Sequence, residues 1–361
     1  MRLKPLKTGT TIGILGGGQL GRMLALAAAR LGLQCHVYTP EPDDCALQVV
    51  QKRTVADYAD NRALRTFAAD CDVITYEFEN VPAVTAALLA ARKPVLPDPT
   101  VLKATQDRLI EKNFVRKLGL STVDFASVSS LEQLTEAAKA IGLPAVLKTR
   151  RFGYDGKGQA AIRVGDDLVR KWRSMKGAPC VLERFANFEQ EVSVIVARGA
   201  DGILAYFDVT ENVHRNHILK FSSVPAQIPV ALAAKARLIA GRIAHALDYV
   251  GVMAVEMFVV RGARGPSLLV NEIAPRVHNS GHWTIDGATV SQFEQHIRAI
   301  AGWPLVRPAR HGQMRMINLI GDEILNCGSW LRKPGSALHI YGKGQPSAGR
   351  KMGHVTVAAK Q

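Results

Sequence analysis

The chain has 361 residues, 47% of them hydrophobic, which is enough for two or three packed domains in an ordinary soluble globular protein. The five cysteines are odd in number and widely scattered, and none has a Cys-x-x-Cys spacing; a disulfide framework and a zinc knuckle are therefore disfavoured, and a reducing cytoplasm fits best. The formal charge of +15 would suit nucleic acid, but Lys and Arg are spread along the chain without a basic run interleaved with aromatics. We expect no nucleic-acid partner, and ascribe the excess charge to a basic cleft and a solvated face.

The N-terminal region carries no predicted membrane segment. Residues 1–10 are basic and lack the apolar core of a secretory signal, so we expect a loose tail. The longest apolar stretch, Ile12 to Leu33, is broken by a glycine cluster and by Arg22. This pattern predicts a strand, a turn and a helix rather than a membrane span.

Strands and helices are then predicted to alternate. The predicted strands are Thr11–Leu15, Cys35–Tyr38, Val73–Tyr76 and the short Val95–Leu96, with an Ala- and Leu-rich helix at Gln19–Leu31. This alternation favours a parallel α/β sheet, and we place a Rossmann-like domain at residues 11–105.

After two predicted helices, Gln106–Leu118 and Leu131–Ile141, the pattern changes to α+β. Strands are predicted at Ala145–Thr149, Gln159–Val164, Cys180–Arg184, Glu191–Ala197 and Ala205–Val209, with a helix at Asp166–Met175. A helix at Val230–Leu247 precedes a predicted hairpin of Val252–Val260 and Leu268–Ile273. We place a second domain at residues 106–304 and a small β-rich closing module at 305–361.

The first motif with chemical potential is Gly16-x-Gly18-x-x-Gly21, between a strand and a helix. Glycine backbone at a helix N-terminus can accept an anionic group. A dinucleotide site is weakly supported, because the second strand runs into Thr39 and Pro40 instead of ending on an acidic residue. A phosphate-ester site and a purely structural tight turn both stay open.

The second motif is a strand-borne lysine, Lys148, followed by a loop with Gly153, Gly156 and Gly158. Backbone N–H groups freed by these glycines can face phosphate oxygens, while the lysine supplies a fixed positive charge and the loop can close to exclude water. The alternative is a hairpin turn with exposed charges. Because such a turn needs only one or two glycines, we favour a triphosphate-binding loop.

The third motif is a pair of glutamates in the predicted hairpin. If its loop is centred near Arg264, Glu256 and Glu272 fall opposite one another on one face. Opposed carboxylates repel unless a cation lies between them, and Mg²⁺ is usually held by one or two carboxylates together with phosphate oxygens. The alternative is an edge hairpin with both glutamates in solvent, but their apolar surroundings favour the metal site.

A dense polar run follows, from Asn271 to Trp283. His278 and His282 have the spacing of zinc ligands on a helix, but Pro275 and Gly281 argue against a helix there. Arg276 and Asn279 better suit the orientation of a small oxyanion, although Asn279 would equally suit a structural turn.

These motifs, in this order, resemble the ATP-grasp superfamily and, within it, the N5-carboxyaminoimidazole ribonucleotide synthetases. The resemblance covers nearly the whole chain. It rests on Arg151 to Gln159 and Ala274 to Trp283, together with segments 16–22, 77–82, 251–256 and 349–354. It implies an ATP-grasp fold with an N-terminal Rossmann-like domain, a lid subdomain at about 120–184 and a small C-terminal β-rich module.

The resemblance also implies roles for individual residues. ATP would be bound by Arg108, Lys148, Gly153, Tyr154, Asp155, Gly156, Lys157, Gly158, Gln159, Glu183, Arg184, Phe185, Ala186, Glu191, His214, Asn271 and Glu272. The ribonucleotide would be bound by Tyr154, Asp155, Lys157, Arg350 and Lys351, with Gln19 and Glu77 as weaker candidates. Magnesium would be held by Glu256 and Glu272 with Asn279, and the catalytic residues would be Arg276, Asn279 and Lys148. Some relatives have arginine in place of Lys157, so a bidentate phosphate contact would here be a point charge.

The implied reaction joins bicarbonate to 5-aminoimidazole ribonucleotide at the expense of ATP, through carboxyphosphate, in a cytoplasmic homodimer that uses Mg²⁺. The nearest alternative is another ATP-grasp ligase, a formate-dependent glycinamide ribonucleotide transformylase. A dinucleotide-dependent oxidoreductase would use the first glycine motif but leave the second motif and the glutamate pair without a role. A non-enzymatic nucleotide sensor would bind without turnover.

Overall fold

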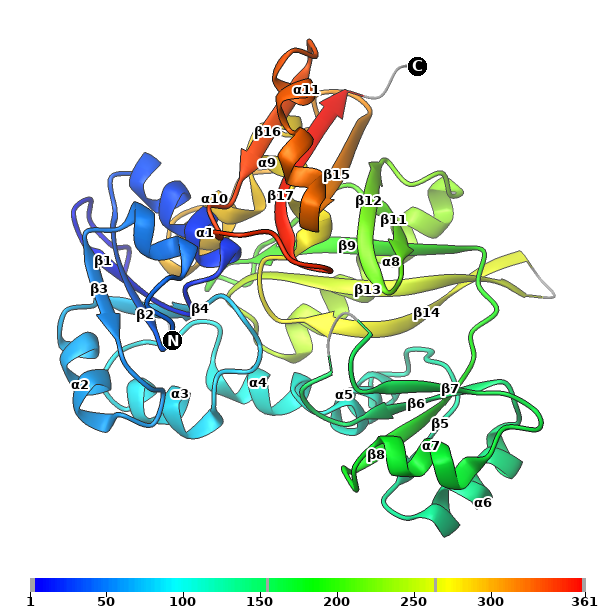
Figure 1. The fold of residues 1–361 in the computed structure, drawn as a ribbon. Helices are drawn as coiled ribbons and strands as arrows, with labels where there is room; N and C mark the ends of the chain where they lie inside the picture. Colours follow the sequence, from blue (N-terminus) through cyan, green and yellow to red (C-terminus); the bar gives the residue numbers. More distant parts are fainter. Residues whose placement is uncertain (1–3, 154–155, 263–264, 359–361) are drawn as a thin grey trace.

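The computed structural model describes residues 4–153, 156–262 and 265–358, and in this part of the chain the strands form three sheets (Figure 1). Together they give the predicted combination of an α/β first domain and an α+β remainder. Most of the predicted strands and helices are confirmed, with ends that agree to within three residues.

The first sheet is parallel, as predicted, with the order β3-β2-β1-β4. Helix α1 begins at the first glycine motif and buries Leu20, Met23, Leu24 and Ala28, an i, i+3, i+4 pattern that packs one helical face on the core. Val95 makes only an isolated bridge to Ile74, so the short fourth strand is not formed as a full strand. The elements of this layer are β1 (Thr11–Leu15), α1 (Gln19–Arg30), β2 (Gln34–Thr39), η1 (Cys45–Val49), β3 (Lys52–Val55), α2 (Asn61–Ala69), β4 (Val73–Tyr76) and α3 (Ala83–Ala90).

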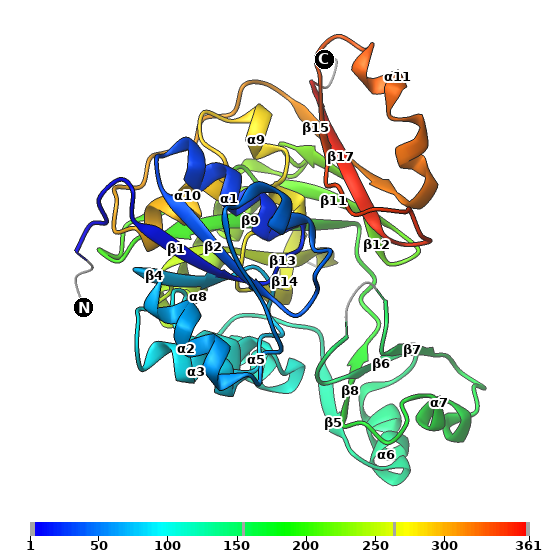
Figure 2. The ribbon, with the colours of Figure 1, turned by 60° about the vertical axis from the view of Figure 1, so that its left-hand side comes forward.

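Two helices, α4 (Pro99–Thr105) and α5 (Arg108–Lys117), lead to a separate antiparallel sheet with the order β5-β8-β6-β7. Figures 1 and 2 show this layer, with its two helices, projecting away from the rest of the molecule. Its elements are β5 (Phe125–Val128), α6 (Leu131–Ile141), β6 (Ala145–Thr149), β7 (Gln159–Ile162), α7 (Leu168–Ser174) and β8 (Cys180–Arg184).

The third sheet has nine strands in the order β14-β13-β9-β11-β12-β15-β17-β16, with β10 paired to β9. The C-terminal strands β15 to β17 therefore extend the same sheet as the glutamate hairpin. Strands β11 and β12 had no prediction from the sequence. The elements are β9 (Gln190–Arg198), β10 (Leu204–Tyr206), β11 (Thr210–Arg215), β12 (Ile218–Val224), α8 (Val230–Ala246), β13 (Gly251–Gly262), β14 (Gly265–Ala274), η2 (Asn279–Gly281), α9 (Thr284–Gly287), α10 (Gln292–Ile300), β15 (Met314–Ile320), η3 (Gly321–Asn326), α11 (Gly328–Leu331), β16 (Ser336–Ile340) and β17 (Lys351–Ala358).

The prediction of a loose N-terminal tail is wrong at Leu6. Its N–H donates to the Ala301 carbonyl at 2.9 Å, and its carbonyl accepts from Trp303 Nε1 at 2.8 Å. Its side chain packs against the core, so hydrophobic burial and two hydrogen bonds hold this segment. Across the described ranges, no helix has the length and apolar character to cross a membrane.

Candidate active site

The glutamate pair lies where the hairpin register predicts it, but for a partly different reason. Gly262 pairs with Gly265, and that register would bring Glu256 opposite Asn271. A β-bulge between Glu256 and Met257 leaves Asn271 as the extra residue and moves Glu272 opposite Glu256. The bulge also turns Glu272 to the same face as Glu256, because without it alternation would place Glu272 on the buried face of Val270.

Cationic and polar side chains surround the pair. Arg108 Nη1 lies 3.3 Å from Glu272 Oε2, and His278 Nε2 lies 3.3 Å from Glu256 Oε1. Burial, then the neighbouring Glu272 carboxylate, raise the pKa of Glu256, while His214 opposes this rise. Two adjacent carboxylates repel each other, and a divalent cation between them would remove this repulsion. Carboxylate oxygens are also the ligands that such a cation prefers, and one or two of them are usual.

Lys148, predicted to contact ATP phosphates, is paired with a buried glutamate. Its Nζ donates to Glu183 Oε2 at 2.8 Å, and Lys112 Nζ lies 3.3 Å from Glu183 Oε1. Burial raises the pKa of Glu183, but the two lysines outweigh it and hold this pKa at about 2. Lys112 was missed by sequence reasoning, since a lysine inside an amphipathic helix carries no signal of burial.

Glu183 itself lies within its sheet, between Phe125 of β5 and Val146 of β6. In the segment predicted to bind adenine, the N–H groups of Arg184 and Phe185 donate to the carbonyls of Asp124 and Pro144. Within the described ranges, no hydrogen bond engages the N–H of Ala186, which follows directly. The side chain of Phe185 is 51% exposed, so it offers an apolar surface next to that free backbone group.

The predicted ribose ligand Glu191 and the predicted nucleotide contact His214 are joined by a short hydrogen bond between Glu191 Oε2 and His214 Nδ1. They lie on the paired strands β9 and β11, and β9 also pairs with β13, the hairpin strand that carries Glu256. Burial lowers the pKa of His214, but Glu191, then Glu256 and Glu272, raise it above its ordinary value. His214 is therefore favoured as a cation among three carboxylates.

The second glycine loop lies beside Arg108, whose Nη2 donates to the Gly153 carbonyl at 3.4 Å. Gly156 and Gly158 have positive φ angles of 81° and 69°, a backbone conformation that favours glycine. Lys157 is exposed, and Gln159 Nε2 lies 3.3 Å from His217 Nδ1. The predicted site residues Tyr154 and Asp155 lie outside the described residues.

Arg276 forms a two-point ion pair with Glu79, one contact of which is Nη2 to Oε1 at 3.1 Å. Glu79 lies in segment 77–82, on which the resemblance partly rests, but the sequence does not predict it as a site residue. Asn279 is 9% exposed, and its Oδ1 accepts from Asn318 Nδ2 at 2.6 Å. A carbonyl oxygen has two lone pairs. The second lone pair of Asn279 Oδ1 can therefore bind a metal ion or accept a hydrogen bond from a ligand.

The first glycine motif is occupied by the protein itself. Glu77 accepts hydrogen bonds from the N–H groups of Gly18 at 2.7 Å and Gly21 at 2.9 Å. A Cβ on Gly18 would lie 2.6 Å from Glu77 Oε1. These amides therefore hold an internal carboxylate, which favours the structural alternative over a phosphate or dinucleotide site there.

Residues predicted to bind the ribonucleotide come together from both ends of the chain. Burial is the main cause that lowers the pKa of Lys343. Arg350 and Lys351 lower this pKa further, while Glu77 raises it. Lys351 also lowers the pKa of His278, after burial and Arg276. The segments that carry Lys343 and Lys351 therefore lie near Glu77 and near His278, which contacts Glu256. Lys343 was missed, because a lysine between two loop glycines resembles an ordinary exposed turn.

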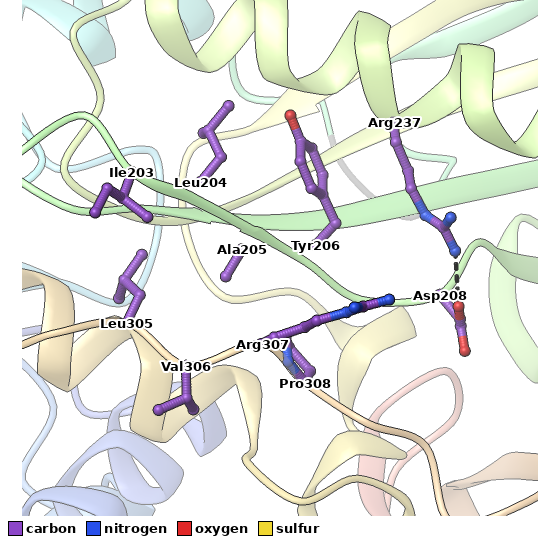
Figure 3. Close-up of a pocket in the computed structure, with 10 residues that line it drawn as sticks. All are labelled: Ile203, Leu204, Ala205, Tyr206, Asp208, Arg237, Leu305, Val306, Arg307 and Pro308. Carbon is purple, nitrogen blue, oxygen red and sulfur yellow. Dashed lines mark hydrogen bonds and ion pairs between the residues drawn. The ribbon is translucent and has the colours of Figure 1, made fainter.

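A cavity of about 410 Å³ lies away from these residues, between β10, α8 and the connection after α10 (Figure 3). Asp208 at its edge is paired with Arg237 at 2.7 Å and with Arg310 at 3.0 Å. None of the lining residues belongs to the predicted site. The convergence of charged groups, not the size of the cavity, locates the candidate active site.

The chain is similar to known proteins over nearly its whole length. Family models match in chain order: a ribonucleotide synthetase preATP-grasp domain at residues 9–106, an ATP-grasp domain at 113–293 and a phosphoribosylaminoimidazole carboxylase C-terminal domain at 315–361. The N5-carboxyaminoimidazole ribonucleotide synthase of Brucella melitensis is 50% identical over 353 residues, which cover 97% of each chain. The chain belongs to the N5-carboxyaminoimidazole ribonucleotide synthase family.

Solved structures of this family superpose closely. The ADP complex of an N5-carboxyaminoimidazole ribonucleotide synthetase is 42% identical with a TM-score of 0.95, and the match covers 99% of this chain and 94% of that one. The enzyme from Aspergillus clavatus, in complex with ADP and 5-aminoimidazole ribonucleotide, is 31% identical with a TM-score of 0.90, covering 98% and 94%. The predicted ATP-grasp fold and family are thus confirmed.

Proposed function

We propose that this chain uses ATP to carboxylate the amine of 5-aminoimidazole ribonucleotide with bicarbonate in purine biosynthesis, as a synthase of N5-carboxyaminoimidazole ribonucleotide. The observation that carries the proposal is the opposed pair Glu256 and Glu272, with Arg108 on the Glu272 side, in a chain of this family. A bicarbonate oxygen attacks the γ-phosphorus, the bond to the β-phosphate oxygen breaks, and ADP leaves. The amine nitrogen then attacks the carboxyphosphate carbon, releasing phosphate and losing a proton.

Glu256 and Glu272 would hold Mg²⁺, with Asn279 nearby, and Asn271 at the bulge would border the nucleotide. The ion would neutralise charge on the phosphates during transfer. The mutual repulsion of the two carboxylates supports this role, because a divalent cation removes it.

Lys148 and Arg108 would contact the triphosphate beneath the glycine loop, and closure of that loop would exclude water from carboxyphosphate. Ala186 offers a free N–H for adenine beside Phe185. Glu191, held by His214, is suited to accept hydrogen bonds from ribose hydroxyls.

Arg276 would orient bicarbonate or its phosphorylated form, since its guanidinium keeps donor groups beyond those used by Glu79. Lys157, Arg350 and Lys351, with Tyr154 and Asp155, would bind the ribonucleotide. Gln19 is a weaker candidate at the start of α1. For Glu77 the role would be indirect, because its carboxylate is committed to Gly18 and Gly21.

We further propose a cytoplasmic homodimer, as the resemblance implies. The proposed division of each chain is a Rossmann-like domain at residues 11–105, an ATP-grasp domain at 106–304 with its lid at about 120–184, and a closing module at 305–361.

The test measures ADP release by the full chain with ATP, Mg²⁺ and 5-aminoimidazole ribonucleotide, with and without added bicarbonate in carbonate-depleted buffer. Release that requires both the ribonucleotide and bicarbonate supports the proposal. Release that ignores bicarbonate, or that requires formate and glycinamide ribonucleotide instead, contradicts it.

A further inference from the structure

A buried chain of hydrogen bonds fastens the loop of Arg276, His278 and Asn279 to the C-terminal strands. It starts at the Leu219 carbonyl, which can only accept and which receives a hydrogen from Asn318 Nδ2 at 2.8 Å. Asn318 Nδ2 therefore points its other hydrogen to Asn279 Oδ1 at 2.6 Å, and Asn279 Nδ2 returns a hydrogen bond to Asn318 Oδ1 at 3.1 Å. A backbone group thus fixes the orientation of both amides.

The second hydrogen of Asn279 Nδ2 faces His282 Nδ1 at 3.0 Å, so this nitrogen must accept and the ring proton is on Nε2. The Tyr341 hydroxyl lies 3.0 Å from the same His282 nitrogen and 2.8 Å from His354 Nδ1. An imidazole nitrogen has one lone pair, so the Asn279 N–H and the Tyr341 hydroxyl share that of His282 Nδ1; a hydrogen lies in every contact when Tyr341 donates to His282 and His354 donates from Nδ1 to the Tyr341 oxygen. Asn318, His282 and His354 are fully buried, so water cannot replace a lost partner.

This chain of hydrogen bonds ends beside His278, which contacts Glu256. Asn279 begins the short η2 helix that ends next to His282, so His282 fixes the placement of that helix. On the other side of Asn279, His278 accepts at Nδ1 from the Ser280 N–H at 3.3 Å, which leaves its Nε2 hydrogen facing Glu256.

We propose that Tyr341 is a positioning residue, which acts through His282 to hold Asn279 and its loop against the Glu256–Glu272 pair. The inference rests on the proposed metal role of that pair and gives the C-terminal strands a part in building the site. Partners that orient the ligands of a metal site commonly change metal affinity or activity by about 10- to 100-fold when removed.

The experiment compares Tyr341→Phe with Tyr38→Phe. Tyr38 is also buried and loses one hydroxyl hydrogen bond, to the Asp57 carbonyl at 2.6 Å, in the first sheet. Calorimetry measures ADP binding over a range of Mg²⁺ concentrations. We expect Tyr341→Phe to raise the half-saturating Mg²⁺ concentration about 10-fold, with ADP binding in the absence of Mg²⁺ unchanged, and Tyr38→Phe to leave both unchanged.

An unchanged Mg²⁺ dependence in Tyr341→Phe overturns the proposal, and so does an equal shift in Tyr38→Phe. The Mg²⁺ dependence of ADP binding is measured without turnover. Its outcome is therefore independent of the bicarbonate dependence that tests the proposed function. Where turnover is present, kcat should fall in Tyr341→Phe with the KM for ATP unchanged, and adding Tyr341→Phe to Asn279→Ala should cause no further loss.

If Tyr341→Phe does not fold, His354→Phe decides the question. It keeps an aromatic ring beside His339, whose ring centroid lies 4.5 Å from that of His354, and it removes the hydrogen bond that orients the Tyr341 hydroxyl toward His282. A smaller Mg²⁺ shift of the same sign supports the proposal, and no shift overturns it.

Discussion

The two glycine-rich loops of this protein look alike in the sequence but differ in their surroundings. The first loop has its amides hydrogen-bonded within the protein, whereas the second lies beside charged side chains that are not balanced. At the first loop, the amides of Gly18 and Gly21 are saturated by Glu77, a carboxylate from the same chain. At the second loop, Arg108 lies between the Gly153 carbonyl and Glu272, whose neighbour Glu256 has a raised pKa. Glycine content therefore does not mark a ligand site; unbalanced charge does.

The largest expected effect comes from Glu272→Gln, which removes one member of the unbalanced pair. We expect kcat for ADP release to fall about 10³-fold, or about 4 kcal/mol, because the site loses a metal-binding charge. Thermal unfolding should shift little or upward, since repulsion with Glu256 is relieved. Near-normal turnover in steady-state kinetics would remove the metal role from this pair.

Glu183→Gln should have the next largest effect, on stability. It leaves Lys148 and Lys112 facing a neutral amide, and breaking a buried ion pair in this way costs about 3 kcal/mol. Chemical denaturation at pH 7 measures the loss, with Glu132→Gln on the exposed face of α6 as the control.

The difference in unfolding free energy between wild type and Glu183→Gln should depend on pH, because the pKa of Glu183 is lowered in the folded protein. The unfolded carboxyl titrates near 4.5 and the folded one near 2, so the stabilisation is fully present above about pH 5. It should be lost as the pH falls from about 5 to 2, which brings the unfolding free energies of wild type and Glu183→Gln together. A difference that stays constant over this range would show that Glu183 acts by packing and not by charge.

The smallest effect is expected at the first loop. Gly18→Ala would place a Cβ 2.6 Å from Glu77 Oε1, and relief of this overlap should cost about 1–3 kcal/mol of stability. ATP affinity should remain unchanged, because this loop holds Glu77 and not the nucleotide. Gly328→Ala, where a Cβ meets nothing within 4 Å, is the matched control. A large loss of ATP affinity in Gly18→Ala alone would reverse the contrast between the loops.

The sequence predicts the strand and helix pattern well where hydrophobic periodicity is strong, as in α1, β6 and β8. It does not predict β11 and β12, because β11 has one apolar residue, Val213, and β12 mixes apolar and polar residues without a regular alternation. The opposition of Glu256 and Glu272 was predicted from spacing, yet it depends on a bulge at Asn271 that no local signal reveals. Lys112, Glu79, Asn318 and Tyr341 were missed because their roles come from tertiary contacts between segments far apart in the chain.

The most direct test of the central claim follows an oxygen atom. Turnover with ¹⁸O-labelled bicarbonate, ATP, Mg²⁺ and 5-aminoimidazole ribonucleotide should transfer one labelled oxygen to each phosphate released, because bicarbonate oxygen attacks the γ-phosphorus. Mass spectrometry of the phosphate measures this transfer. Phosphate that carries no label, released at the same rate as the carboxylated product, would contradict phosphorylation of bicarbonate in this site.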